Sequence, residues 1–450
     1  MPYEGEYASY QPLRRIAESE RVQRLLTRAR VFKPSSDLPD AVPAAVPESD
    51  RPLPEFVLAI DGSNAEVDVV TGYPGAKVGY CTVASVLLNL KLINRLDESR
   101  PVDPIAFRTA EQAATVDAAL PGSNVVTRDH VSARAAFRES LFDILHDEII
   151  DEDDGTSLLQ TYEELLVRKP TARQQACPYE AEGCGQHLTI GSGTSNCVCD
   201  RQRPIYSTDA LRIHERFRDV GTNGESFGEV MQVWERIMLI HLLLCFERRG
   251  WLGRLDRLAF IVDGPLALFG HPAWLSAAIS AELKRLNALV REQSGYDLVL
   301  LGIEKSGTFV THFEEIDQRE EPGEEHFPPH SCFLPDDHYI KSRVIFSNSD
   351  KRYGRDTYFG RKLFYKSSSG ARVVANVPFL TDEQDTLAAS DLDLYPQIPP
   401  SCQLLDHLVS ARYANAVTPI ISANAQAAIP LNLGANVLQQ LARALMRAES

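Results

Sequence analysis

The stretch Phe56-Val57-Leu58-Ala59-Ile60-Asp61-Gly62-Ser63 runs from five apolar residues straight into an acid, a glycine and a hydroxyl. Pro54 precedes the apolar run and Gly62 follows it. A continuous apolar run of this length is typical of a β-strand that is buried on both faces. We therefore predict a buried strand that ends at Asp61, so that its carboxylate lies at the edge of a sheet on rigid backbone.

Two later stretches repeat this arrangement. Residues 258–262 are apolar and run into Asp263-Gly264-Pro265, and residues 298–303 run into Glu304 and Lys305. Two buried strands that each end in Asp-Gly suggest two acids that meet at one end of one sheet. Such a pair is a common way to hold a divalent cation, and the third strand would bring a lysine to the same end.

Length and composition restrict the class of protein. A chain of 450 residues indicates one large domain with insertions, or two to three domains. A net charge of −16 argues against a free-standing DNA-coating protein, although an acidic enzyme can still act on nucleic acid through one basic groove or through a partner. No apolar run approaches the ~20 residues of a membrane helix, and the N-terminus lacks a secretory signal, so we expect a cytoplasmic protein without membrane contact.

The sequence pattern divides the chain into four parts. Residues 1–54 contain a helix and a linker with six prolines between positions 33 and 54. The helix would dock on a partner or second subunit, or pack on its own domain. Residues 55–170 would form the first part of the α/β domain with a helical segment, residues 171–204 an insertion, and residues 205–450 the remainder with C-terminal helices.

The insertion carries the most specific local pattern. Cys177, Cys184, Cys197 and Cys199 have the spacing C-x6-C, twelve residues, C-x-C. Disulfides are disfavoured in the reducing cytosol, whereas four thiolates can close a tetrahedral zinc site. We predict a structural zinc site, since four thiolates leave no open coordination position, with His187 able to replace one cysteine. The alternative is an irregular loop with free thiols.

A helix expected at residues 227–249 is apolar on several faces, and its acid Glu235 lies among apolar neighbours. The helix should run antiparallel to the strand at residues 258–263. Asp263 lies ~17 Å along that strand, which corresponds to ~11 helical residues counted back from Arg249. This places Asp263 near position 238, so Glu235 is a candidate third acid; the alternative is a surface acid on a narrow polar face.

Residues 353–366 alternate aromatic and basic side chains, including Arg361 and Lys362. Aromatic rings that stack on bases, interleaved with cations that bind phosphates, suit a groove for a single strand. An exposed amphipathic hairpin would have the same composition.

Four short motifs, in order, resemble the NurA nucleases: residues 58–63, 261–266, 302–306 and 419–424. The resemblance spans about residues 55–430 and points to a long bacterial form with a cysteine-rich insertion. It implies an α/β fold with an RNase H-like mixed sheet flanked by helices. It also implies a manganese-dependent endo- and 5′-to-3′ exonuclease that forms homodimers and works with the hexameric ATPase HerA, in DNA end processing or in anti-phage defence.

The resemblance assigns the catalytic positions to three acids and a lysine: Asp61, Glu235, Asp263 and Lys305. Glu139 and Glu229 are the alternatives to Glu235. Mn2+ and Mg2+ prefer carboxylate oxygens, and two such ions ~3.5–4 Å apart can activate water and stabilise the leaving oxygen. Asp61 would bridge the ions, and Lys305 would neutralise phosphate charge and so also contact the nucleic acid.

The C-terminal motif departs from the family. The family commonly has a histidine preceded by a tyrosine eight residues earlier, where this chain has Asn424 and Ala416. An asparagine cannot donate a proton as histidine does, and His407 or Tyr413 would have to substitute. Two other functions therefore stay open: an inactive zinc-stabilised scaffold that binds DNA and the ATPase, and an RNase H-type nuclease that acts on RNA.

Overall fold

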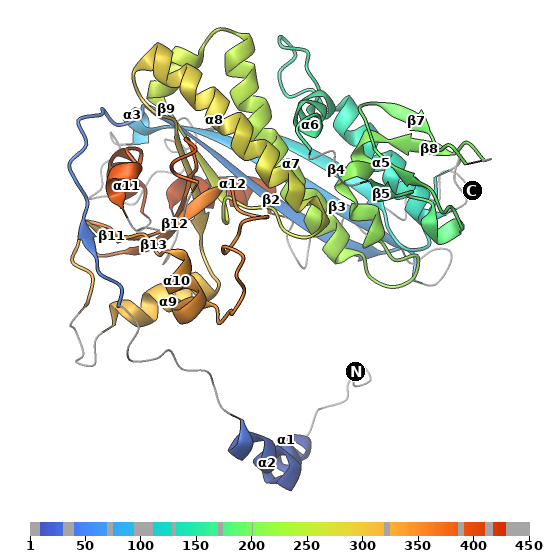
Figure 1. Ribbon diagram of the computed structural model, residues 1–450, viewed down its shortest axis with the longest axis horizontal. Helices are drawn as coiled ribbons and strands as arrows, with labels where there is room; N and C mark the ends of the chain where they lie inside the picture. Colours follow the sequence, from blue (N-terminus) through green and yellow to red (C-terminus); the bar gives the residue numbers. More distant parts are fainter. Residues whose placement is uncertain are drawn as a thin grey trace.

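The computed structural model describes residues 10–29, 40–69, 75–93, 111–127, 132–169, 174–199, 201–318, 325–385, 391–409 and 417–428. At its centre lies a nine-stranded mixed sheet with the order β1-β11-β12-β13-β10-β9-β2-β3-β4, which Figure 1 shows flanked by helices. The strands are β1 Ala44–Ala45, β2 Phe56–Asp68, β3 Lys77–Asn89, β4 Glu111–Pro121, β9 Leu258–Asp263, β10 Val299–Glu304, β11 Ser331–Phe333, β12 Gly360–Lys366 and β13 Arg372–Pro378. The predicted mixed α/β architecture is confirmed.

Three neighbouring strands of the sheet run parallel. β9 pairs in parallel with β2 on one side and with β10 on the other, whereas the other pairings in the sheet are antiparallel. Parallel strands bring their carboxyl ends to the same edge of a sheet. The chain segments that follow the apolar parts of β2, β9 and β10 therefore meet at one edge.

β2 is longer than the sequence predicts. It pairs with β3 without interruption from Phe56 to Asp68, so Asp61 lies inside the strand. Its parallel pairing with β9 stops at Ile60, which faces Val262. Asp61 therefore lies where the neighbouring strand ends, although its own strand continues.

β4 lies within residues 106–170, whose sequence pattern is mostly helical. Its sequence is rich in alanine, but it pairs with β3 from Glu111 to Pro121. Tertiary pairing thus overrides a weak helical preference here.

Helices cover both faces of the sheet. The helices with more than one turn in the globular part are α5 Ala133–Asp147, α6 Leu158–Leu166, α7 Gly224–Arg248, α8 Leu275–Ser294, α9 Thr308–Asp317, α11 Ile398–Leu408 and α12 Thr418–Ala427, and the short helices are α3 Leu90–Ile93 and α10 Asp337–Tyr339. α5 to α8 share one hydrophobic core with Ile60 of β2, and α11 and α12 share another with Ala59. Side chains alternate between the two faces along a strand. In β2, even-numbered residues such as Ile60 therefore face α5 to α8, and odd-numbered residues such as Ala59 face α11 and α12.

The N-terminal helix expected over residues 12–30 is two short helices, α1 Gln11–Glu18 and α2 Glu20–Arg28. None of their residues is buried, and Figure 1 shows them away from the sheet. The helix predicted near residues 433–446 lies outside the described residues. Among the described residues, no helix has the length and apolar character needed to cross a bilayer.

The cysteine-rich insertion forms two small hairpins. Their strands are β5 Gln175–Ala176, β6 His187–Leu188, β7 Thr194–Asn196 and β8 Pro204–Tyr206. Arg138 on α5 anchors them: its guanidinium donates at 2.6 Å to both carboxylate oxygens of Asp209 and at 3.1 Å to the Pro204 carbonyl. It also lies 4.4 Å from the ring centroid of Tyr179. Both charged partners are buried, so this ion pair ties the insertion to the helical layer.

We expect Arg138→Met to lower the free energy of unfolding by about 3–5 kcal/mol, because it leaves the Asp209 carboxylate buried without its partner. Arg14→Met is a matched control, since Arg14 forms only an exposed ion pair with Glu18, and we expect a change within about 0.5 kcal/mol. Chemical denaturation of both variants gives the two values. Equal stabilities would contradict the anchoring role of Arg138.

Candidate functional site

Strand register brings two of the predicted acids together. Ile60 pairs with Val262, so the next residues, Asp61 and Asp263, lie side by side at the edge of the parallel strands. β10 brings Lys305 to the same edge. Its Nζ lies 3.3 Å from Oδ2 of Asp61 and 2.9 Å from Oδ1 of Asp263. Both aspartates thus share one ammonium group.

Burial and like charge set the protonation of these groups. Asp61 is 2% exposed, and burial together with the Asp263 charge raises the pKa of its carboxyl to about 7 although Lys305 opposes the shift. Burial lowers the pKa of Lys305, but the two aspartates more than offset it, so its pKa lies above the usual value. The edge therefore combines a carboxylate poised near neutral pH with a stable positive charge.

Glu235 approaches the site from the opposite face of the sheet. It lies on α7 and is 4% exposed. The backbone of Gly62 separates it from Asp61: a Cβ at Gly62 would lie 2.8 Å from Oε1 of Glu235, so only glycine fits without displacing the glutamate. Burial raises the pKa of Glu235 to about 8; Arg236 opposes the rise, and the charges of Asp61 and Asp263 add to it.

Arg236 is a residue of this site that the sequence analysis missed. Its guanidinium lies 3.2 Å from Oε2 of Glu235 and donates to the backbone carbonyls of Asp263 at 3.1 Å and Pro265 at 2.9 Å. It is 2% exposed, so it fixes the loop after β9 to α7. A charged pair at adjacent positions of a helix that is otherwise apolar was the available signal.

These acids do not form a compact cluster. Asp61, Glu235 and Asp263 are not among the described groups of three or more metal-ligand residues whose ligand atoms lie within 4.8 Å of one another. The Lys305 ammonium lies between the two aspartates, and Glu235 lies behind Gly62. The donor set still suits a hard divalent cation, because Asp61 and Asp263 direct carboxylate oxygens to one position that a positive charge already stabilises.

The other acids and polar residues considered from the sequence lie elsewhere. Glu139 accepts a hydrogen bond from the Tyr206 hydroxyl at 3.2 Å, and Glu229 forms an ion pair with Arg216 at 2.9 Å. Asn424 is exposed on α12, which packs on the sheet face toward which Asp61 and Asp263 point. His407 is exposed on α11, whereas Ala416 and Tyr413 lie outside the described residues.

Arg361 and Lys362 are not on an exposed hairpin. They are 1% and 3% exposed. Lys362 forms a buried ion pair with Glu304, and Arg361 donates to the Tyr395 hydroxyl at 3.2 Å. Both side chains are buried and hydrogen-bonded inside the protein, which corrects the expectation that they line a groove for nucleic acid.

Three of the four cysteines of the insertion, Cys177, Cys184 and Cys197, bring their sulfur atoms within 4.8 Å of one another. Cys197 Sγ lies 3.5 Å from Cys177 Sγ and 3.6 Å from Cys184 Sγ. Cys199 hydrogen-bonds with Cys197 and Cys184, which lowers the pKa of its thiol to about 7. Zn–S bonds of ~2.3 Å in a tetrahedron require sulfur atoms about 3.8 Å apart. The thiols therefore fit a zinc ion with little movement.

A second group, Asp154, His241 and Cys245, also brings ligand atoms within 4.8 Å of one another. Here the protein supplies its own cation, because the Arg248 guanidinium donates to Asp154 at 2.8–3.1 Å. The acidic run at residues 151–155 is thus partly held by ion pairs rather than simply solvated.

We expect the metal-free protein to lose stability as pH rises from about 4.5 to about 8. Glu235 holds a proton in the folded state over this range but releases it when unfolded, so rising pH favours unfolding. Glu235→Gln should flatten this slope and raise stability at pH 8 by an amount of the order of 3 kcal/mol. Denaturation in excess chelator at several pH values measures both, and parallel curves for the two proteins would refute the assignment. A residual slope from Asp61 is expected in the variant.

Comparison with known proteins places the chain in a family. A family model described as the NurA domain matches residues 56–410, whereas no curated protein matches. The NurA nuclease from Sulfolobus solfataricus is 11% identical, with 100% of this chain and 99% of that chain covered and a TM-score of 0.29. Another NurA structure is 11% identical, with 97% and 98% covered and a TM-score of 0.27. A NurA structure with manganese is 13% identical, with 96% and 95% covered and a TM-score of 0.23.

TM-scores this low do not establish a shared fold, so the assignment rests on the family model. That model covers most of the chain, including β2, β9 and β10. It ends before residues 419–424, so it does not bear on the correspondence of Asn424. The chain belongs to the NurA domain family.

Proposed function

We propose that this protein is a metal-dependent nuclease that hydrolyses phosphodiester bonds in DNA. The observation that carries the proposal is the meeting of Asp61 and Asp263 on the Lys305 ammonium at the carboxyl edge of parallel strands. Membership of the NurA domain family supports it. The order β4-β3-β2-β9-β10, with β2, β9 and β10 parallel, also supports an RNase H-like core.

The residues of the edge have distinct roles in this proposal. A bound Mn2+ or Mg2+ would supply Lewis-acid activation of water and of the scissile phosphate. Asp61 and Asp263 would provide its carboxylate ligands. We assign Glu235 as the third acid, because its carboxylate lies directly behind Gly62, next to Asp61 in the chain. Lys305, whose charge persists at neutral pH, is placed to bind a phosphate oxygen of the substrate.

The finer features come from the family resemblance, except for the cytoplasmic location, which comes from the sequence. We propose endo- and 5′-to-3′ exonuclease activity, a homodimer, a cytoplasmic location and cooperation with a HerA-like hexameric ATPase, in DNA end processing or anti-phage defence. Asn424 in place of the family histidine favours a second candidate, a scaffold subunit that binds DNA and the ATPase without cleavage.

The cysteine cluster supports a structural zinc site. We propose that Cys177, Cys184, Cys197 and Cys199 hold one Zn2+. The sulfur spacing of the first three suits a tetrahedral site, and Cys199, two residues after Cys197, would supply the fourth thiolate. His187 is exposed, and four thiols need no further ligand. The ion would link the two hairpins of the insertion, which are too short to hold together alone.

We expect Asp61→Asn and Asp263→Asn each to reduce Mn2+-dependent cleavage by 10²–10³-fold or more, roughly the loss on removal of one charge-stabilising group from an active site. Labelled linear DNA, incubated with purified protein alone and with a HerA-type ATPase, reports the activity. Asp297→Asn is a matched control: Asp297 is half-buried, as Asp263 is, but it precedes β10, at the opposite end of the parallel strands.

The outcomes separate the candidates. Cleavage by the wild type that survives in both site variants would contradict the assignment of the edge. Binding of DNA and ATPase without cleavage would identify the scaffold, and cleavage of RNA–DNA hybrids or RNA in preference to DNA would identify an RNase H-type nuclease.

For the zinc site, elemental analysis of the purified protein should give about one zinc per chain. We expect Cys184→Ser to lose most of this zinc, because three thiolates bind less tightly than four. Cys245→Ser is the matched control, since Cys245 is a buried thiol in the other group of potential ligands. Full zinc content in Cys184→Ser would exclude the proposed ligand set.

A further inference from the structure

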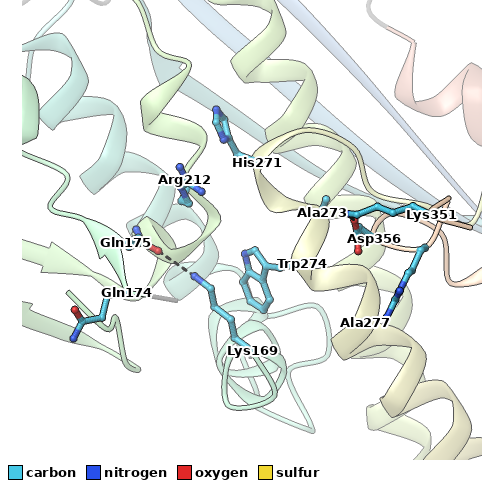
Figure 2. Close-up of a pocket in the computed structure, with 11 residues that line it drawn as sticks. Lys169, Gln174, Gln175, Arg212, His271, Ala273, Trp274, Ala277, Lys351 and Asp356 are labelled. Atoms are coloured by element: carbon cyan, nitrogen blue, oxygen red, sulfur yellow. Dashed lines mark hydrogen bonds and ion pairs between the residues drawn. The ribbon is translucent and has the colours of Figure 1, made fainter. Parts of the chain in front are cut away.

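A basic cavity lies beside the cysteine-rich insertion, away from the strand edge. It encloses about 830 Å³, and Figure 2 shows side chains from separate segments around it. The residues that matter here are five basic groups and one aromatic ring: Lys169, Arg212, His271, Trp274, Lys351 and Arg355. A cavity of this size suits a ligand of several ring systems or a short polymer segment.

The cavity is positive in a chain whose net charge is −16. Two of its cations are neutralised: Arg212 pairs with Glu215 at 2.6 Å, and Lys351 pairs with Asp356 at 3.0 Å. In the part of the chain that the structure describes, no carboxylate forms an ion pair with Lys169 or Arg355. Two uncompensated positive charges therefore face a single space, which favours an anionic ligand.

Lys169 and Trp274 form a fixed pair on the cavity wall. The Lys169 ammonium donates to the Ala210 carbonyl at 3.1 Å and to the Gln175 amide oxygen at 3.0 Å, and it lies 5.0 Å from the Trp274 ring centroid. The indole Nε1 of Trp274 donates to the same carbonyl at 3.0 Å. Figure 2 shows the indole beside the lysine side chain. Both groups are pre-organised, so little ordering is needed to bind a ligand.

The loop after β9 links the strand edge to the cavity wall. His271 follows Gly270, against which the carboxylate of Glu229 packs. Glu229 and Glu235 are six residues apart on α7, which corresponds to ~9 Å. The chain that leaves Asp263 reaches His271 directly, and Phe269 within it is held by Gln232 of α7. One wall of the cavity is therefore joined by a short loop to the strand that carries Asp263.

We propose that this cavity binds a segment of single-stranded DNA, with its phosphates held by Lys169 and Arg355 and a base stacked on Trp274. The inference rests on the proposed function, because it assumes that the substrate is DNA. Cations for phosphates together with an aromatic platform are the elements of single-strand recognition. The cavity would thus bind nucleic acid, a role that Arg361 and Lys362 cannot have because they are buried.

The test measures binding of a labelled single-stranded oligonucleotide to the full chain in chelator, where no cleavage occurs. Trp274→Leu should raise Kd by about 5- to 100-fold, the range for loss of one base-stacking platform. Arg355→Gln should raise Kd and reduce the slope of log Kd against log salt by ~0.7, because one phosphate contact is lost. Arg355 is exposed, so this variant leaves folding unchanged.

Lys284→Met is the matched control. It removes one positive charge from α8 at a position outside the cavity, where Lys284 pairs with Asp382, and Kd should stay within about twofold of the wild-type value. The inference would be overturned if Trp274→Leu and Arg355→Gln had the same Kd and the same salt dependence of Kd as the wild type. The inference would also be overturned if a mononucleotide displaced the labelled oligonucleotide at the same concentration as an unlabelled oligonucleotide does. The cavity would then bind a free nucleotide and not a strand.

The two proposals fail separately. Suppose that the wild type cleaves DNA and that the cavity variants bind and cleave DNA as the wild type does. This result would refute the cavity as a DNA-binding site but would support the nuclease proposal. If instead the cavity variants bind DNA more weakly but the wild type does not cleave DNA in Mn2+, the cavity would be supported as a DNA-binding site and the nuclease proposal would be refuted.

Discussion

The contact of one ammonium group with two aspartates underlies the proposed chemistry. Lys305 bridges Asp61 and Asp263 at the edge where β2, β9 and β10 run parallel. Two carboxylates this close repel each other, and burial makes charge on Asp61 costly. A positive charge between them is therefore what allows the acids to stay together in the folded chain. An incoming divalent cation would meet ligands that are already gathered, and a lysine that remains beside them for the phosphate.

Much of this edge could be predicted from the sequence, because apolar runs that end in polar residues identify buried parallel strands. The ends of β9 and β10 follow that pattern. Counting residues along the strand and the helix selected Glu235, which the structure places behind Gly62; its role in the site stays a prediction. The length of β2 could not be predicted, since residues 61–66 are mostly polar or small. They remain in a strand only because β3 pairs with them throughout.

Other failures have a common physical cause: a side chain's partner is set by the tertiary fold. Lys362 looked exposed because basic residues usually are, but Glu304, 58 positions earlier, neutralises it in the interior. The basic cavity could not be predicted from the sequence for the same reason. Its residues come from four separate segments, and none carries a local motif. The cysteines, by contrast, are close in sequence as well as in space, so their spacing alone indicated the cluster.

The alternation of side chains along β2 has a consequence for how insertions and deletions act on this protein. Asp61 points toward the layer of α12, while Gly62 lies against Glu235 in the layer of α7. A deletion or duplication of a single residue upstream in β2 would exchange the two. The carboxylate of Asp61 would then lie against the buried Glu235, and the Lys305 ammonium would face glycine, which has no side chain to contact it. The face that the carboxylate reaches therefore depends on whether its position in β2 is odd or even.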